Sequence, residues 1–169
     1  TKEEKLDSYI EDGDNAANKS VYRDALEYNG AIVGLDTKYV MKLIEFANSI
    51  ELDEAKERLN ILQKEIISTK EILQKISCTK DKDNKYKNTF ISLYNHLEKQ
   101  YCNSWPLVLD EMDKLNEESQ ENGIDALNFN EYLNSATYIP SLYKVSILEG
   151  EEQNLRDNTV SAQETFAKE

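Results

Sequence analysis

The feature that most constrains the fold of this chain is an uninterrupted heptad pattern. Between positions 55 and 76, apolar or small side chains alternate at intervals of four and three residues, as Ala55, Leu59, Leu62, Ile66, Thr69, Leu73 and Ile76. Such spacing places one stripe along one side of an α-helix and is typical of coiled-coil packing. Because no Gly or Pro interrupts it, the pattern predicts a continuous helix over about 54–77. Ile61, Ile67 and Ile72 lie off this stripe and are expected to contact a further helix.

A longer apolar stripe precedes this pattern, over 14–50, and contains Gly30 and Gly34. Each glycine costs about 1 kcal/mol relative to alanine inside a helix. The stripe nevertheless stays in phase across both, which predicts one helix. The alternative is a break near Gly34, with Asp36 as the N-cap of a new helix.

A third stripe, over 86–115, contains Pro106. A proline inside a helix removes one backbone hydrogen bond, so we expect either a kink or a second segment that Ser104 caps and Pro106 opens. Gly123 is the expected residue after the end of this helix. A short helix or helical crossover is expected over 125–137, and Pro140 should open a last helix that extends to about 166.

These helices and their short connections predict an all-α fold, an up-down-up-down four-helix bundle with a short extra helix before the last long helix. The bundle would be a single domain, 14–169, preceded by a polar lead-in or tether, 1–13. The composition agrees, since 169 residues include only 5 Gly and 2 Pro and so favour helices over turn-rich β folds.

Charge excludes some classes of partner. The formal net charge is -13, which argues against a nucleic-acid surface and against docking on anionic lipid headgroups. The chain also has no run of 18 apolar residues, so no spanning helix and no direct membrane insertion are expected.

Side chains that hold metals or perform catalysis are few. The single histidine, His96, has Leu93 three residues before it, so the paired Glu-x-x-His motif of di-iron bundles is missing. Cys78 would lie at a helix–helix turn and Cys102 roughly 25 Å along the next helix, too far for a disulfide. The acidic stretches 12–15 and 81–84 suit turns and N-caps better than a calcium loop. We therefore expect no catalytic residue, metal site or cofactor.

Aromatic side chains around the last connection are poorly explained by helical periodicity. They are Trp105, Phe129, Tyr132, Tyr138 and Tyr143. One interpretation is an exposed partner-binding patch, because aromatic side chains next to backbone irregularities often anchor partners. The other is a satellite core that closes one end of the bundle.

Two terminal segments resemble a known kind of protein. The sequence YNGAIV at 28–33 and AQETFAK at 162–168, with a heptad-bearing hairpin between them, resemble a loosely defined family of small all-helical bacterial surface proteins or lipoproteins without assigned activity. The resemblance implies presentation outside the cytoplasm by a lipid anchor upstream of this segment. It assigns no functional residue.

Two functions follow as expectations. The first is a non-enzymatic extracytoplasmic module, at the cell surface or in the periplasm, that binds a protein partner or has a structural role. The alternative is a cytoplasmic acidic adaptor or immunity-type protein that sequesters a partner protein.

Overall fold

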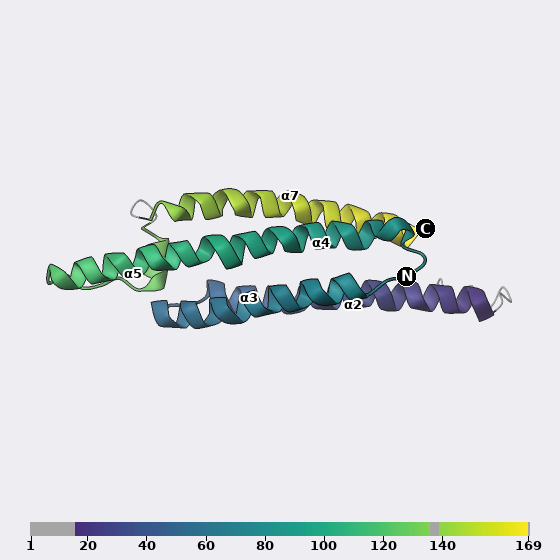
Figure 1. The fold of residues 1–169 in the computed structure, drawn as a ribbon, viewed down its shortest axis with the longest axis horizontal. Helices are drawn as coiled ribbons and strands as arrows, with labels where there is room; N and C mark the ends of the chain where they lie inside the picture. Colours follow the sequence, from purple (N-terminus) through teal and green to yellow (C-terminus); the bar gives the residue numbers. More distant parts are fainter. Residues whose placement is uncertain (1–15, 136–138, 169) are drawn as a thin grey trace.

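The computed structural model describes residues 16–135 and 139–168, with side chains from Lys19 onward. Within these ranges every regular element is helical and no strand occurs, which confirms the all-α prediction for this part of the chain. Long helices extend along a common axis (Figure 1). In chain order the elements are α2 Ala16–Ala47, α3 Leu52–Lys75, η1 Lys82–Asn84, α4 Lys85–Glu98, η2 Lys99–Ser104, α5 Trp105–Glu121, α6 Phe129–Leu133 and α7 Ser141–Lys168. The predicted lead-in over 1–13 lies outside the described residues.

Helix α2 is continuous through both of its glycines, so the predicted single helix is confirmed and the alternative break near Gly34 is wrong. Gly30 and Gly34 are exposed. A Cβ added at either position would meet no atom within 4 Å. The core-facing residues of α2 lie on its opposite side, among them Ile32 and Tyr39, both 0% exposed.

Helix α3 begins and ends within two residues of the predicted bounds. Its heptad stripe is buried from Ala55 to Leu73, as expected. The expectation for Ile61, Ile67 and Ile72 is wrong, because these side chains are 39–43% exposed. The reason is that α2, α4 and η2 pack against α3 and cover its stripe, while the off-stripe residues remain at the surface.

The helical path from α4 to α5 passes Pro106 without a break, through the π-helical segment η2. Pro106 lies in the first turn of α5, but the Ser104 side chain makes no capping bond. Instead, the Trp105 N–H donates to the Gln100 carbonyl five residues earlier. This widened turn leaves the Tyr101 carbonyl without the Trp105 donor, and Pro106 has no N–H to offer. The Gln63 side chain of α3 donates to that carbonyl, at 2.9 Å.

The end of α5 and the start of α6 follow standard capping patterns. Gly123 has φ 69°, and the N–H groups of Gly123 and Ile124 donate back to the carbonyls of Gln120 and Ser119. These bonds make a Schellman motif. Asn128 and Glu131 form a capping box at the start of α6, which confirms the short helix expected in this region.

The connection between α3 and α4 is organised by the buried carboxylate of Asp81. It accepts hydrogen bonds from the N–H groups of Tyr86 and Lys87, at 2.9 and 3.0 Å, and from the Tyr28 hydroxyl of α2, at 2.6 Å. Asp83 and Asn84 adopt positive φ angles of 56° and 53°, which Asp and Asn tolerate better than most residues. The chain can therefore turn back so that Asp81 caps α4. The acidic stretch thus has the N-cap role expected of it.

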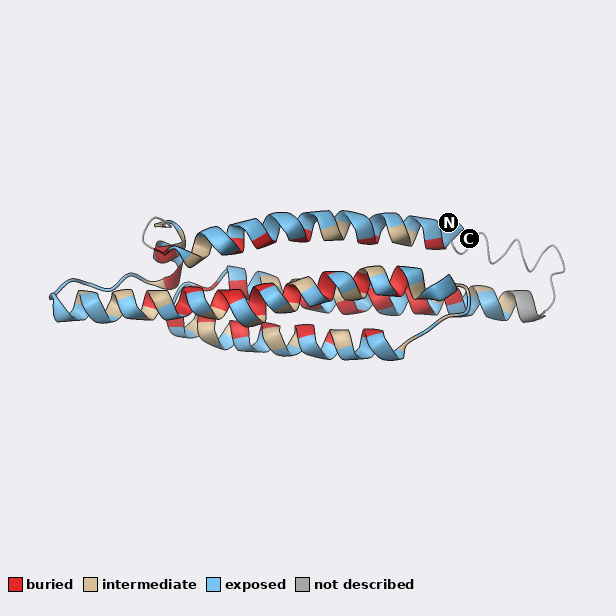
Figure 2. Cartoon of the chain, turned by 45° about the horizontal axis from the view of Figure 1, so that its top comes forward, coloured by how far each residue is buried: buried red, intermediate tan, exposed pale blue. Residues whose placement is uncertain are grey.

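Neighbouring helices pack in chain order, α2 on α3, α3 on α4, and α4 on α7. Helices α2 and α7 also meet, where the rings of Tyr28 and Phe166 lie 5.6 Å apart between centroids and where Arg156 pairs with Asp36 at 3.2 Å. Buried residues face the interior between the helices (Figure 2). No helix in the described part of the chain has the length and apolarity needed to cross a membrane.

Candidate functional site

The five aromatic residues expected to form one patch differ in their exposure and location. Trp105, Phe129 and Tyr132 are buried, at 6%, 0% and 3% exposure. Tyr143 is 75% exposed on α7, and Tyr138 lies outside the described residues. Trp105 and Phe129 come together, with ring centroids 6.3 Å apart, while Tyr132 donates its hydroxyl to Asn116 of α5. The described members therefore do not share one exposed surface.

Trp105 and Phe129 instead line an apolar cavity of about 280 Å³. It lies where the end of α2, the π segment, α6 and the start of α7 meet. Its walls consist of four aromatic and four aliphatic side chains, and its remaining lining residues are small or polar. The lining residues are Phe46, Tyr101, Trp105, Phe129, Leu43, Leu133, Leu142, Val145, Ala47, Ser146 and Glu149.

The aromatic wall is held by ring-to-ring contacts around Phe46. The Phe46 ring lies 5.0 Å from Trp105, nearly perpendicular at 89°, and 5.6 Å from Phe129. Tyr101 contacts Phe46 edge-on at 6.4 Å. Edge-to-face pairs of this kind are favourable beyond the area they bury. Rings from α2, the π segment, α5 and α6 thus support one another in this wall.

Two polar groups of the lining have no partner among the described residues. The Trp105 Nε1 is buried and makes no hydrogen bond there. Glu149, exposed on α7, forms no ion pair with any described basic side chain. Desolvation of its carboxyl and, second, the nearby Glu152 carboxylate raise the pKa of Glu149. The pocket thus combines largely apolar walls with one carboxylate that has no partner among the described residues.

Sequence reasoning placed Phe46 and Tyr101 on the apolar stripes, so it interpreted them as core residues. Both are indeed buried, yet each also faces the cavity. Glu149 carried no signal, because it stands in a run of polar residues on α7. These residues can be recognised as neighbours only when the position of α6 across the ends of α2 and α7 is known.

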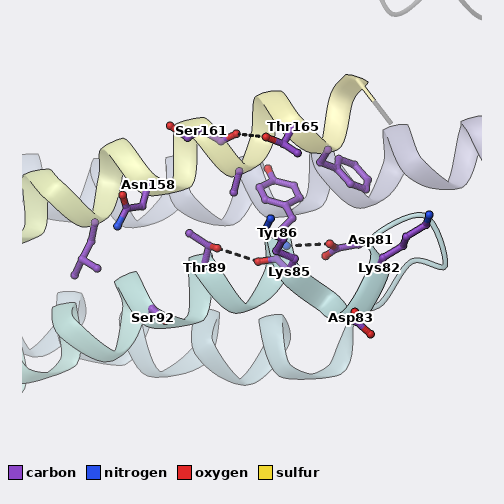
Figure 3. A pocket seen from close by; sticks show the side chains of 13 residues that line it. Asp81, Lys82, Asp83, Lys85, Tyr86, Thr89, Ser92, Asn158, Ser161 and Thr165 are labelled. Carbon is purple, nitrogen blue, oxygen red and sulfur yellow. Dashed lines mark hydrogen bonds between the residues drawn. The ribbon is translucent and has the colours of Figure 1, made fainter.

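A second and larger hollow, of about 580 Å³, is a groove between α4 and α7 (Figure 3). Most of its hydroxyl groups already donate hydrogen bonds within the protein. Thr89 donates to the Lys85 carbonyl and Thr165 to the Ser161 carbonyl, at 2.9 and 3.0 Å (Figure 3). The Tyr86 hydroxyl donates across the interior to Asn29, at 2.7 Å. Despite its volume, the groove therefore has fewer polar groups free for a ligand than its residue types suggest.

A partly buried ionic cluster links α2, α4 and α7. Arg156 pairs with Glu152 at 2.8 Å and with Asp36 at 3.2 Å. Tyr94 of α4 donates its hydroxyl to Asp36 at 3.0 Å, and the Arg156 guanidinium lies 5.4 Å from the ring centroid of Tyr39. Arg156 thus bridges carboxylates on two helices, and we interpret this cluster as a structural link between helices.

The residues considered for metal or redox chemistry lie apart from the cavity. His96 donates its Nε2 hydrogen to the Leu148 carbonyl, at 2.8 Å, and so joins α4 to α7. Cys78 and Cys102 are free thiols, as predicted, and burial followed by the Glu98 charge raises the pKa of Cys102. Within residues 16–135 and 139–168, no three His, Cys, Asp or Glu side chains are grouped so as to hold a metal ion.

No protein-family model, no curated protein and no solved structure matches the chain.

Proposed function

We propose that this protein is a non-enzymatic binding module whose ligand occupies the cavity lined by Phe46, Tyr101, Trp105 and Phe129. The observation that supports the proposal most is a half-open pocket of about 280 Å³ whose walls bring together four aromatic and four aliphatic side chains. Apolar cavities of about 150 Å³ already bind benzene. A ligand with a single ring, or a ring-bearing side chain of a protein partner, has a matching size and surface.

The scaffold that we propose for this site is a single-domain, up-down-up-down four-helix bundle of α2, α3, α4 to α5, and α7, with α6 as the short extra helix. The chain-order packing of the helices and the Arg156–Asp36 pair that joins the last helix to the first support this arrangement. A single domain of this kind unfolds in one step. Urea unfolding followed by Trp105 fluorescence and by far-ultraviolet circular dichroism should then give superimposable curves, whereas separated midpoints would contradict it.

We also propose that the module works outside the cytoplasm, held at the cell surface or in the periplasm by a lipid anchor upstream of Thr1. This rests on the resemblance to bacterial surface proteins. The alternative is a cytoplasmic adaptor or immunity-type protein that uses the net charge of -13 to sequester a basic partner protein. Mass spectrometry of the native protein separates the two, since a lipid-modified N-terminal cysteine supports the first and an unmodified cytosolic chain supports the second.

The binding proposal can be tested with a neutral probe, phenethyl alcohol, because Trp105 is the only tryptophan of the chain and reports on its own cavity. We expect saturable changes in Trp105 fluorescence. The variant Ser146→Phe places a ring at the cavity lining and should abolish them. The matched control Ser161→Phe, an exposed change on the same helix but in the groove between α4 and α7, should leave them intact. Absence of saturable binding to the unmodified protein would contradict the proposal.

A further inference from the structure

The charge beside the aromatic cavity indicates what kind of ligand fits it. We propose, on the basis of the proposed binding function, that the cavity takes a small organic cation with an apolar body, an arylalkyl or alkyl ammonium group. The apolar body packs between Phe46, Trp105 and Phe129, and the ammonium group lies against the Glu149 carboxylate.

The charge of the cavity lining favours a cation. Glu149 lines the cavity and has no ion-pair partner among the described residues. Its neighbour Glu152, in contrast, is paired with Arg156 at 2.8 Å. A ligand cation would give Glu149 the partner that the chain does not supply, and the net charge of -13 attracts cations to the molecule as a whole.

The aromatic walls of the cavity also favour a cation. The lining includes four aromatic side chains, those of Phe46, Tyr101, Trp105 and Phe129. Aromatic faces attract ammonium groups through their quadrupoles, and tryptophan does so most strongly. An anion would meet both these negative faces and the Glu149 carboxylate. A neutral ligand would leave the carboxylate unpaired.

The residues that line the cavity include no basic side chain. The groove between α4 and α7 differs in this respect, since Lys82 and Lys85 lie along it. A third hollow, of about 540 Å³ at the start of α3 and the end of α5, has more carboxylates, among them Glu51 and Asp113, but no aromatic side chain. Of the three, the cavity alone combines an acidic side chain and aromatic walls with the absence of basic residues.

The test compares three probes that share a ring and a short chain: phenethylamine, phenethyl alcohol and 3-phenylpropionate. Isothermal titration at neutral pH and low salt should show phenethylamine binding about fivefold more tightly than the alcohol, a difference expected for one partly exposed charge pair next to an aromatic wall. The preference should shrink as salt is added. The propionate should bind least.

Glu149→Gln is the matching variant, since it removes the charge and keeps the shape. It should bring the affinities of amine and alcohol to within about twofold of each other, without weakening the alcohol. The control Glu164→Gln, an exposed change near the far end of α7, should preserve the preference. If the unmodified protein binds amine and alcohol equally, or Glu149→Gln retains the preference, the ligand class is wrong while the cavity remains a binding site. If none of the three probes binds, the proposed function itself fails.

Discussion

Pro106 is the residue whose chemistry shapes most of its surroundings. It lacks an N–H, and the helix accommodates this by widening into the π segment η2, where Trp105 donates to Gln100. The free Tyr101 carbonyl is then satisfied from another helix by Gln63. A π turn next to Pro106 also gives Tyr101 and Trp105 their positions in the cavity lining. Backbone irregularities of this kind are frequent at functional sites.

The energetic coupling between the Gln63 hydrogen bond and Pro106 can be measured by a double-mutant cycle. Gln63→Met removes the donor but keeps the length of the side chain, and should lower the free energy of unfolding by about 1 kcal/mol. In a Pro106→Ala background, residue 106 regains an N–H, so the same change should cost less than half as much. The control is Gln74→Met, an exposed change on the same helix. Equal costs in both backgrounds, measured by urea unfolding, would show that the two residues act independently.

At the scale of single residues, the sequence could identify Pro106 as a site where the helix is irregular, but it could not predict which backbone geometry the helix adopts there. A kink, a new capped segment and a π turn all accommodate a missing N–H. The choice depends on a donor from α3, 38 residues away in sequence, which no local pattern contains. Asp81 is a similar case, because its polar sequence context predicts a cap while its bond to Tyr28 depends on the tertiary fold.

At the scale of the elements, apolar periodicity predicted the long helices well. The stripes of α2 and α3 match the buried residues closely, because each stripe faces its neighbours. Periodicity was less informative about α7, where the buried set includes Glu152 as well as Val145 and Leu148. Glu152 is stabilised there by Arg156 one turn later. A pattern based on apolar residues alone cannot include such a pair.

The heptad stripe of α3 provides a quantitative prediction with a neighbouring control. Leu62 is 0% exposed, whereas the adjacent Ile61 is 39% exposed. Leu62→Ala should therefore lower the free energy of unfolding by about 2–5 kcal/mol, because it deletes buried methyl groups and leaves a cavity. Ile61→Ala should cost less than about 1 kcal/mol. Comparable losses for the two variants in urea unfolding would mean that the stripe does not face the core.

At the scale of the whole molecule, the interior is unusually rich in tyrosine. Burial is the largest cause that raises the pKa of each of five tyrosines above its ordinary value, with neighbouring charges adding to it. They are Tyr28, Tyr39, Tyr86, Tyr94 and Tyr101. Their rings connect helices, as in the contact of Tyr39 with Tyr94 at 5.7 Å.

These shifts predict sensitivity to alkali. A tyrosine whose pKa is higher in the folded than in the unfolded state contributes stability below the unfolded value of about 10, and that contribution is lost as pH rises above it. Each such group can lower the free energy of unfolding by up to about 1.4 kcal/mol per pH unit in this range. Tyrosinate absorbance of these five groups and loss of helical circular dichroism should then rise together above about pH 10. Full tyrosine ionisation of a protein that remains helical would contradict the burial.

The cavity also belongs to the scale of the whole molecule, since its lining comes from α2, η2, α5, α6 and α7. The sequence could indicate Trp105 and Phe129 as aromatic residues near an irregular connection. It could not predict that they face inward together with Phe46 and Glu149, because this requires knowing where α6 lies. The proposed exposed patch is thus replaced by a proposed pocket that includes two of the same residues, Trp105 and Phe129.

The ligand site that we propose is this cavity and not the larger groove between α4 and α7. Intermolecular nuclear Overhauser effects between phenethylamine and the protein test it most directly. The account predicts contacts from the probe ring to the Trp105 indole protons and to the Val145 methyl groups, which line the cavity. Contacts to the Leu155 and Ala162 methyl groups, which line the groove, with none to Trp105, would contradict it.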